Sequence, residues 1–176
     1  ENFGSMNVLC SDKTGTLTEG IVTVQGAYDI NGDENTKVLL YAYLNASFET
    51  GFANPIDQAI RIFQPQDISA YQKVGEVTYD FIRKRLSIVV NYANTHLMVT
   101  KGALSNVLEV CSLAETPTGI VDLATARETI EQRFAQFSSQ GLRTLGISYR
   151  IFETSESSIT HQESAMTFLG FSVLAD

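Results

Sequence analysis

Apolar residues recur along this chain with the period of a helix in some segments and of a strand in others. Residues 38–44 form a nearly continuous apolar run among helix-forming residues and predict a buried helix. A second helix is expected to begin at Pro55, because proline is favoured in the first turn and apolar residues follow it at helical spacing. Pro65 limits its extension. Before these helices, residues 7–10 predict a short strand, and residues 21–28 have the β-branched content of another.

The middle of the chain alternates with the period of a strand. Residues 74–79, 86–92 and 97–100 are rich in β-branched and aromatic side chains, and they predict three strands. Residues 93–95 are few enough to form a hairpin loop between the last two. A meander of adjacent strands is therefore expected here.

The helical period returns after Gly102 and gives way to strands again further on. A first helical face carries Leu104, Val107, Leu108 and Cys111. Residues 114–119 are polar, contain Pro and Gly, and are expected to form a loop. A longer amphipathic helix ends at Gly141, and residues 142–149 and 167–174 predict two more strands. Strands mixed with helices, without strict alternation, predict an α+β domain with a mainly antiparallel twisted sheet flanked by helices.

The composition excludes several classes of protein. The 176 residues include 12 basic and 20 acidic side chains, so the formal net charge is −8, and 44% of the residues are hydrophobic. This content can bury a core and excludes an intrinsically disordered chain. A nucleic-acid partner is not expected, because a polyanion would meet net repulsion. No apolar run approaches the roughly 20 residues of a membrane span, so direct membrane contact is not expected either.

The strongest chemical signal is the heptapeptide Asp-Lys-Thr-Gly-Thr-Leu-Thr at residues 12–18, directly after the expected strand 7–10. A carboxylate at a strand end, followed by Gly and several hydroxyl and amide donors, suits a phosphate site with a nucleophile inside it. Asp12 would attack a γ-phosphate and form an acyl phosphate, with Lys13 assisting and Mg²⁺ offsetting the repulsion between carboxylate and phosphate. The alternative is that Asp, Gly and Thr are only turn residues here.

This heptapeptide, preceded by Cys-Ser, resembles the phosphorylation signature of the P-type cation-transporting ATPases. The resemblance implies that Asp12 takes the γ-phosphate of ATP, and that Asp12 and the main-chain carbonyl of Thr14 hold Mg²⁺. The same loop begins the haloacid dehalogenase superfamily, whose phosphatases usually carry a second Asp as general acid/base where this chain has Thr14. Without that group the acyl phosphate should hydrolyse slowly, which suits an intermediate that lasts through a conformational change.

The resemblance extends to the nucleotide-binding domain that follows the phosphorylation loop in this family. Phe81 matches the aromatic residue that stacks on adenine, and Lys101 matches the lysine of a Lys-Gly-Ala turn that lines the nucleotide pocket. Calcium pumps have a lysine where this chain has Leu86, so we expect Arg83 and Arg85 to supply charge to the pocket instead. The nucleotide-binding residues implied by the resemblance are Asp57, Phe81, Arg83, Lys101, Gly102 and Arg143.

Each of these residues also has an ordinary structural role as an alternative. Taken alone, Phe81 would more often be a core residue, and Asp57 a carboxylate on a helix surface. Lys101 would be an exposed turn residue, and residues 83–85 a solvated basic face. Their order along the chain favours the nucleotide site, as do three consecutive basic residues near an aromatic residue in an acidic chain.

The expected protein is the ATP-binding cytoplasmic domain of an ATP-driven cation transporter of the plasma or inner membrane, which forms an aspartyl-phosphate intermediate. Residues 80–90 and 101–112 resemble the magnesium-transporting branch, so magnesium is the expected ion. The family's Gly-Asp-Gly-x-Asn-Asp and Thr-Gly-Glu motifs do not occur in this sequence. The expected partners are therefore adenine nucleotide and the phosphorylation, actuator and transmembrane domains of one longer chain.

We expect three parts in this chain. Residues 1–20 would be a phosphorylation-domain strand, its loop and a hinge, residues 21–170 the nucleotide-binding domain, and residues 171–176 the return hinge. ATP hydrolysis is expected of the longer parent, and nucleotide binding alone of this chain. Two alternatives stay open: a stand-alone nucleotide-binding module without turnover, and a haloacid-dehalogenase-type phosphatase.

Overall fold

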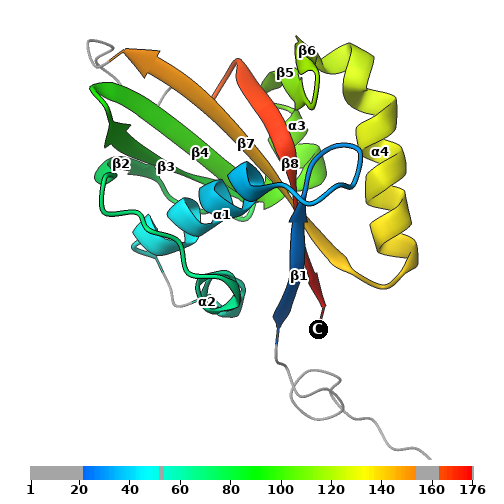
Figure 1. The fold of residues 1–176 in the computed structure, drawn as a ribbon, viewed down its shortest axis with the longest axis horizontal. Helices are drawn as coiled ribbons and strands as arrows, with labels where there is room; N and C mark the ends of the chain where they lie inside the picture. The colour runs from blue at the N-terminus through cyan, green and yellow to red at the C-terminus, as the bar shows by residue number, and fades with distance from the viewer. Residues whose placement is uncertain (1–21, 52–53, 154–162, 176) are drawn as a thin grey trace, which may run out of the picture.

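The computed structural model describes residues 22–51, 54–153 and 163–175 (Figure 1). Within these ranges one twisted sheet of eight strands carries helices on both of its faces. The strands are β1 (Thr23–Tyr28), β2 (Gln72–Val77), β3 (Arg85–Tyr92), β4 (Thr95–Ala103), β5 (Cys111–Thr116), β6 (Gly119–Asp122), β7 (Arg143–Glu153) and β8 (Met166–Ala175). The helices are α1 (Thr36–Phe48), α2 (Pro55–Phe63), α3 (Leu104–Leu108) and α4 (Leu123–Ser139).

The sheet is mainly antiparallel, which confirms the predicted α+β class. Its strand order is β2-β3-β4-β7-β8-β5-β6, and β1 pairs with β8 outside this path. Among the described strands only β5 and β8 run parallel. Strand β1 pairs with the C-terminal part of β8, and Thr23 lies opposite Ala175. The first and last described strands therefore lie side by side (Figure 1).

Helices α1 and α2 cover one face of the sheet. Alternate residues of β3 and β4, such as Leu86 and Val99, are buried beneath α1. The predicted apolar helix over residues 38–44 is confirmed as part of α1, which is buried along much of its length. The buried amide of Asn45 donates to the Val99 carbonyl at 2.9 Å and thereby ties α1 to β4.

Helices α3 and α4 cover the opposite face. They bury a second apolar cluster that includes Val107, Ile130 and the two rings of Phe168 and Phe171, which meet edge to face. The predicted end of the long helix is confirmed, because Gly141 follows α4 with φ of +75°, a conformation that glycine adopts without strain.

Two further local predictions are confirmed. Helix α2 begins at Pro55, and the side chain of Asn54 caps it by accepting a hydrogen bond from the Ile56 N–H at 3.0 Å. The loop between β3 and β4 is a tight hairpin turn in which Ala93 and Asn94 both have positive φ.

The expected loop over residues 114–119 is wrong. These residues belong largely to the β5–β6 hairpin, in which Thr116 pairs with Gly119. The expected helix through Cys111 is also too long, since α3 ends at Leu108 and Cys111 begins β5. Pairing of β5 with β8 outweighs the polar composition and the helical spacing that suggested otherwise.

Strand β2 ends two residues before the predicted end of its strand. The predicted segment 74–79 corresponds to β2 at Gln72–Val77, and the chain then bends before β3 begins. Asp80 stabilises this bend, because its carboxylate accepts hydrogen bonds from the N–H groups of Ile82 and Arg83 at 2.8 and 2.7 Å. The bend over residues 78–84 is called the aromatic turn below, because it carries Tyr79 and Phe81.

Candidate functional site

Asp57 of α2 and Lys101 of β4 meet at the face of the sheet that α1 and α2 cover. The Asn54 cap and Pro55 begin α2 so that Asp57 lies in its first turn, and only 2% of Asp57 is exposed. Lys101 lies two residues after Val99 on the same face of β4, and it is 4% exposed. The two side chains form an ion pair. Asp57 is therefore not a carboxylate on a helix surface, and Lys101 is not an exposed turn residue.

Gly102 lets β4 approach the end of the aromatic turn. A Cβ atom on Gly102 would lie 2.4 Å from the carbonyl oxygen of Lys84 and 2.6 Å from the Cβ of Arg85. The N–H of Ala103 donates to the same Lys84 carbonyl at 3.0 Å. The Lys-Gly-Ala segment thus fixes the place where the aromatic turn enters β3.

Phe81 stands out from the aromatic turn and is 86% exposed. Its ring meets the Tyr79 ring edge to face, with the centroids 5.6 Å apart. Hydrogen bonds from the Ile82 and Arg83 N–H groups to the Asp80 carboxylate fix the backbone of the turn that carries this exposed ring. Phe81 is therefore not a core residue.

Phe81 and Tyr79 line a hollow of about 560 Å³, which we call the aromatic hollow. The volume falls within the usual range of small-molecule sites. Leu86 lines it from β3, and polar groups from α1, α2 and β2 complete it. Its lining residues are Glu49, Gly51, Asn54, Pro55, Glu76, Thr78, Tyr79, Phe81 and Leu86.

A second hollow of about 220 Å³ adjoins the first and shares Asn54, Tyr79 and Leu86 with it. Lys84 and Lys101 line it, together with Gly102, so we call it the basic hollow. The structure therefore brings Phe81, Lys101 and Gly102 to one continuous depression, with Asp57 directly behind Lys101. The depression has an aromatic end and a basic end.

Acidic groups gather at the wall of the aromatic hollow. Burial, a hydrogen bond with Asp57 and the repulsion of its charge raise the pKa of Glu49 to about 8, against the opposing effect of Lys101. Burial would also raise the pKa of Glu76, but hydrogen bonds from Lys73 and Thr50 outweigh it and lower the pKa. Glu76 is therefore ionised and paired, with Lys73 Nζ 2.5 Å from its Oε2.

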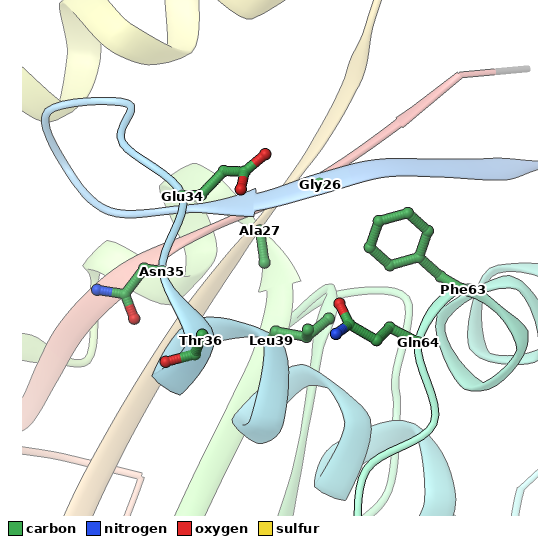
Figure 2. Close-up of a pocket in the computed structure, with 8 residues that line it drawn as sticks. All are labelled: Gly26, Ala27, Glu34, Asn35, Thr36, Leu39, Phe63 and Gln64. Carbon is green, nitrogen blue, oxygen red and sulfur yellow. The ribbon is translucent and has the colours of Figure 1, made fainter.

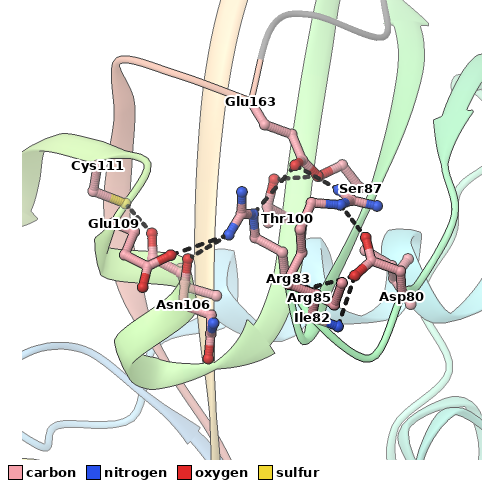
Figure 3. A network of polar contacts seen from close by, with 12 residues as sticks. Asp80, Ile82, Arg83, Arg85, Ser87, Thr100, Asn106, Glu109, Cys111 and Glu163 are labelled. Carbon is pink, nitrogen blue, oxygen red and sulfur yellow. Dashed lines mark hydrogen bonds and ion pairs between the residues drawn. The ribbon is translucent and has the colours of Figure 1, made fainter.

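Arg83 and Arg85 do not line either hollow. Both guanidinium groups bind Glu163 instead (Figure 3), and Arg85 lies on the side of β3 opposite Leu86. Strand alternation explains this, because Leu86 faces the aromatic hollow and its neighbours Arg85 and Ser87 face the other way. The expectation that the two arginines replace a charge at Leu86 does not fit this geometry, and a nucleotide contact of Arg83 stays a prediction.

Glu163 is the centre of this opposite-face network. Its Oε2 accepts from Arg83 Nη1 at 2.7 Å and from Arg85 Nε at 3.2 Å, and its Oε1 accepts from the Ser87 hydroxyl at 2.6 Å. Arg83 also binds the Asp80 carboxylate and donates to the Thr78 carbonyl at 2.7 Å. The network thus anchors the aromatic turn from behind (Figure 3).

Arg143 lies at the start of β7, two residues before Leu145 of the basic hollow and on the same strand face. It pairs in register with Leu174, near the end of β8. The structure places it next to the basic hollow without making it part of the lining, and its phosphate contact stays a prediction. Asp12, Lys13 and Thr14 lie outside the described residues.

Another small pocket, of about 150 Å³, lies between β1, α1 and the end of α2. Figure 2 shows Glu34, Asn35 and Phe63 around it. None of the site residues predicted from the sequence lines this pocket. We therefore take the aromatic and basic hollows as the candidate site.

Sequence reasoning missed Glu49, Tyr79 and Lys84 as site residues. Lys84 was part of the Arg-Lys-Arg run, and no local pattern separates it from Arg85, because it ends the aromatic turn with φ of +47° before β3 begins. Tyr79 lies two residues before Phe81, and this spacing of two aromatic residues could have indicated that both line one site. Glu49 has no signal in the sequence, because only the packing of α1 against α2 brings it to the hollow.

Comparison with known proteins gives a consistent result. Residues 7–176 match the family model described as P-type ATPase, cytoplasmic domain N. The chain is 34% identical over 163 residues to a protein of Escherichia coli K12 named magnesium-transporting ATPase, P-type 1, which covers 89% of this chain and 18% of that protein. It is 30% identical over 190 residues to a probable cation-transporting P-type ATPase of Mycoplasma genitalium, covering 100% of this chain and 20% of that protein.

A more distant relative is the calcium-transporting ATPase 1 of Bacillus cereus, which is 27% identical over 202 residues and covers 100% of this chain and 22% of that protein. The chain thus spans about a fifth of the length of these relatives. In the part of the chain that the structure describes, no helix is long and apolar enough to cross a membrane.

Proposed function

This chain belongs to the family of P-type ATPase cytoplasmic N domains, and from that premise we propose that its aromatic and basic hollows bind adenine nucleotide. The base would stack on Phe81 in the aromatic hollow, and the phosphates would lie toward Lys84 and Lys101. The single observation that supports this most is the exposed ring of Phe81, held on a hydrogen-bonded turn at the wall of a hollow of suitable size.

Energetics favour such a use of Phe81. An aromatic ring that stacks on a base contributes about 1 to 3 kcal/mol per base in other proteins. The ring gains this only when a ligand covers it, since 86% of Phe81 is exposed in the chain alone. Leu86 and Pro55 supply apolar walls on which the edges of a base can pack.

The basic hollow suits the anionic part of the ligand. Lys84 is exposed, and Lys101 is buried with Asp57 as its partner. The formal charge of −8 disfavours a polyanion on the rest of the chain. The two lysines of the basic hollow therefore favour binding of the phosphates there. Arg143, next to this hollow, is proposed as a further phosphate contact, and Arg83 of the aromatic turn as a further nucleotide contact.

In a longer parent protein, the nucleotide held here would be brought to Asp12. Asp12 would attack the γ-phosphate and form the aspartyl phosphate, with Lys13 and Thr14 beside it. Mg²⁺, held by Asp12 and Thr14, would neutralise charge on the transferring phosphoryl group. The names of the relatives support cation transport, and magnesium as the ion. The plasma or inner membrane is proposed as the location of that parent. The partners would then be the phosphorylation, actuator and transmembrane domains of that same parent.

For this chain by itself we propose nucleotide binding without turnover. The test is calorimetric titration of the 176-residue chain with ATP and, separately, with inorganic triphosphate, which carries similar charge without a base. Binding of ATP but much weaker binding of triphosphate would support the proposal. Equal binding of both ligands, or of neither, would contradict base recognition.

The parent's role has its own test. In a full-length parent, D12N should abolish the acid-stable phosphoenzyme formed from ATP and leave nucleotide binding intact. A phosphoenzyme that persists in D12N would place the nucleophile elsewhere.

A further inference from the structure

Glu49 lies at the C-terminal end of α1, where a negative charge is unfavourable. It is the C-cap residue, and its N–H donates to the Asn45 carbonyl at 3.2 Å. The carbonyl end of a helix carries a partial negative charge, and the last turn of α1 contains no basic residue to offset it. Arg61 of α2 donates to the Ala46 carbonyl at 2.6 Å, so it caps the helix end instead of pairing with Glu49.

Asp57 has one satisfied oxygen and one unsatisfied oxygen. Its Oδ1 binds Lys101, whereas its buried Oδ2 has no backbone N–H, hydroxyl or ammonium group as a donor among the described residues. Glu49 lies at the wall of the aromatic hollow beside Asn54 and Pro55 at the start of α2, and burial, a hydrogen bond with Asp57 and the Asp57 charge raise the pKa of its carboxyl group. Two ionised carboxylates in this position would repel each other and leave Oδ2 without a donor. One proton on Glu49 would remove the repulsion and supply that donor.

The charges around Glu49 also favour a proton on its carboxyl group. Asp57 from α2 is paired with Lys101 from β4, and Glu76 from β2 is paired with Lys73 and with the hydroxyl of Thr50. In the described residues, no ion pair reaches Glu49. With Glu49 ionised, the cluster carries three carboxylates against two ammonium groups. With Glu49 protonated, the cluster is neutral.

We propose that Glu49 and Asp57 share one proton and, together with Lys101, form a neutral group at the wall of the aromatic hollow, where Glu49 determines how the site recognises a base. This inference rests on the proposed nucleotide function. The proton of Glu49 is donated to Asp57 Oδ2, so the other Glu49 oxygen is left as an acceptor at the hollow. The ligand group that it fits is an N–H donor on the base, such as the exocyclic amine of adenine.

Nucleotide binding should then be linked to the proton. An ionised Glu49 would add negative charge to a site that receives a polyanion, and a bound base would shield that charge further from water. Nucleotide therefore binds preferentially to the protonated pair. When only one form binds well, the apparent affinity falls in proportion to the fraction of that form. Since the pKa of Glu49 is raised to about 8, that fraction decreases across the mildly alkaline range.

The first test compares ATP binding by the 176-residue chain and by its E49Q variant at about pH 7 and about pH 9. The unmodified chain should lose about tenfold in affinity between these pH values, and E49Q, whose amide stays neutral, should change by less than about twofold. An exposed acid on α4, changed in E128Q, is the matched control and should keep the full pH dependence. Equal pH dependence in the unmodified chain and E49Q would overturn the proposal.

The second test needs no variant and no nucleotide. The side-chain carboxyl carbon of Glu49 can be followed by NMR as the pH is raised. A titration midpoint near 8 supports the shared proton, and a midpoint near 4.5 overturns it. Absence of any ATP binding, together with a midpoint near 8, would contradict the proposed function and leave the acid pair standing.

Discussion

The guanidinium group of Arg83 and the carboxylate of Glu163, 80 residues apart in sequence, lie 2.7 Å apart on the face of the sheet opposite the aromatic hollow (Figure 3). Arg83 also binds Asp80 and the Thr78 carbonyl, which both belong to the aromatic turn. Glu163 therefore supports the turn that presents Phe81, although it does not line the hollow. Sequence spacing gave no indication of this contact.

Replacing Glu163 should destabilise the chain. E163Q removes the charge that two arginines share, and the side chain of Glu163 is only 9% exposed. We expect the free energy of unfolding to fall by about 1 to 3 kcal/mol, because hydrogen-bonded charged groups would lose their partner. Urea denaturation measures this, with E153Q at the exposed end of β7 as the matched control. An unchanged free energy of unfolding in E163Q would mean that the network contributes no stability.

Replacing Phe81 should affect ligand binding far more than stability. F81A removes a ring that is already 86% exposed, so the free energy of unfolding should change little. Loss of stacking should weaken ATP binding by about 5- to 150-fold, the equivalent of about 1 to 3 kcal/mol. The neighbouring I82A is the matched control, since Ile82 is 89% exposed on the same turn and lines neither hollow. Equal loss in both variants would point to the turn's shape instead of stacking.

The buried pair of Lys101 and Asp57 gives a prediction about coupling. K101M leaves an unpaired carboxylate at a position that is 2% exposed, and it should lower the free energy of unfolding by about 3 to 5 kcal/mol. The double variant D57N/K101M should recover part of this loss, because no buried charge remains. Urea denaturation of the two single variants and the double variant measures the coupling. Additive losses would show that the two side chains do not stabilise each other.

The raised pKa of Glu49 predicts how stability depends on pH. The pKa changes from its ordinary value of 4.5 to about 8 on folding. Between these values the folded chain binds more protons than the unfolded chain, so the free energy of unfolding falls as the pH rises, and this contribution changes no further above the folded pKa. E49Q should flatten this slope relative to the unmodified chain, and E128Q should not. Thermal unfolding across the pH range measures it, and a slope that E49Q leaves intact would assign the dependence to another group.

Much of this fold could be predicted from local patterns. The start of α2 follows from Asn54 and Pro55, and the hairpin between β3 and β4 follows from a short loop between alternating segments. These features depend on residues close in sequence. The β5–β6 hairpin was missed because its strands are polar and are held by pairing with β8, which a local pattern does not report.

The candidate site was predictable in part for a similar reason. Phe81 and Lys101 could be proposed because a family resemblance identified them, and the structure brings them to adjoining hollows. The side of the strand on which Arg85 lies follows from alternation with Leu86, but the Arg-Lys-Arg run suggested one basic surface. Glu49 could not be found from the sequence, since its chemistry comes from burial next to Asp57.

The central claim is that this chain binds adenine nucleotide in the depression between Phe81 and Lys101. The most direct measurement is an amide NMR titration of the 176-residue chain with ATP. We expect shifts to cluster in the aromatic turn and around Lys101 and Gly102, with little change in α4 on the opposite face. A flat response at millimolar ATP, or shifts centred away from these two hollows, would contradict the claim.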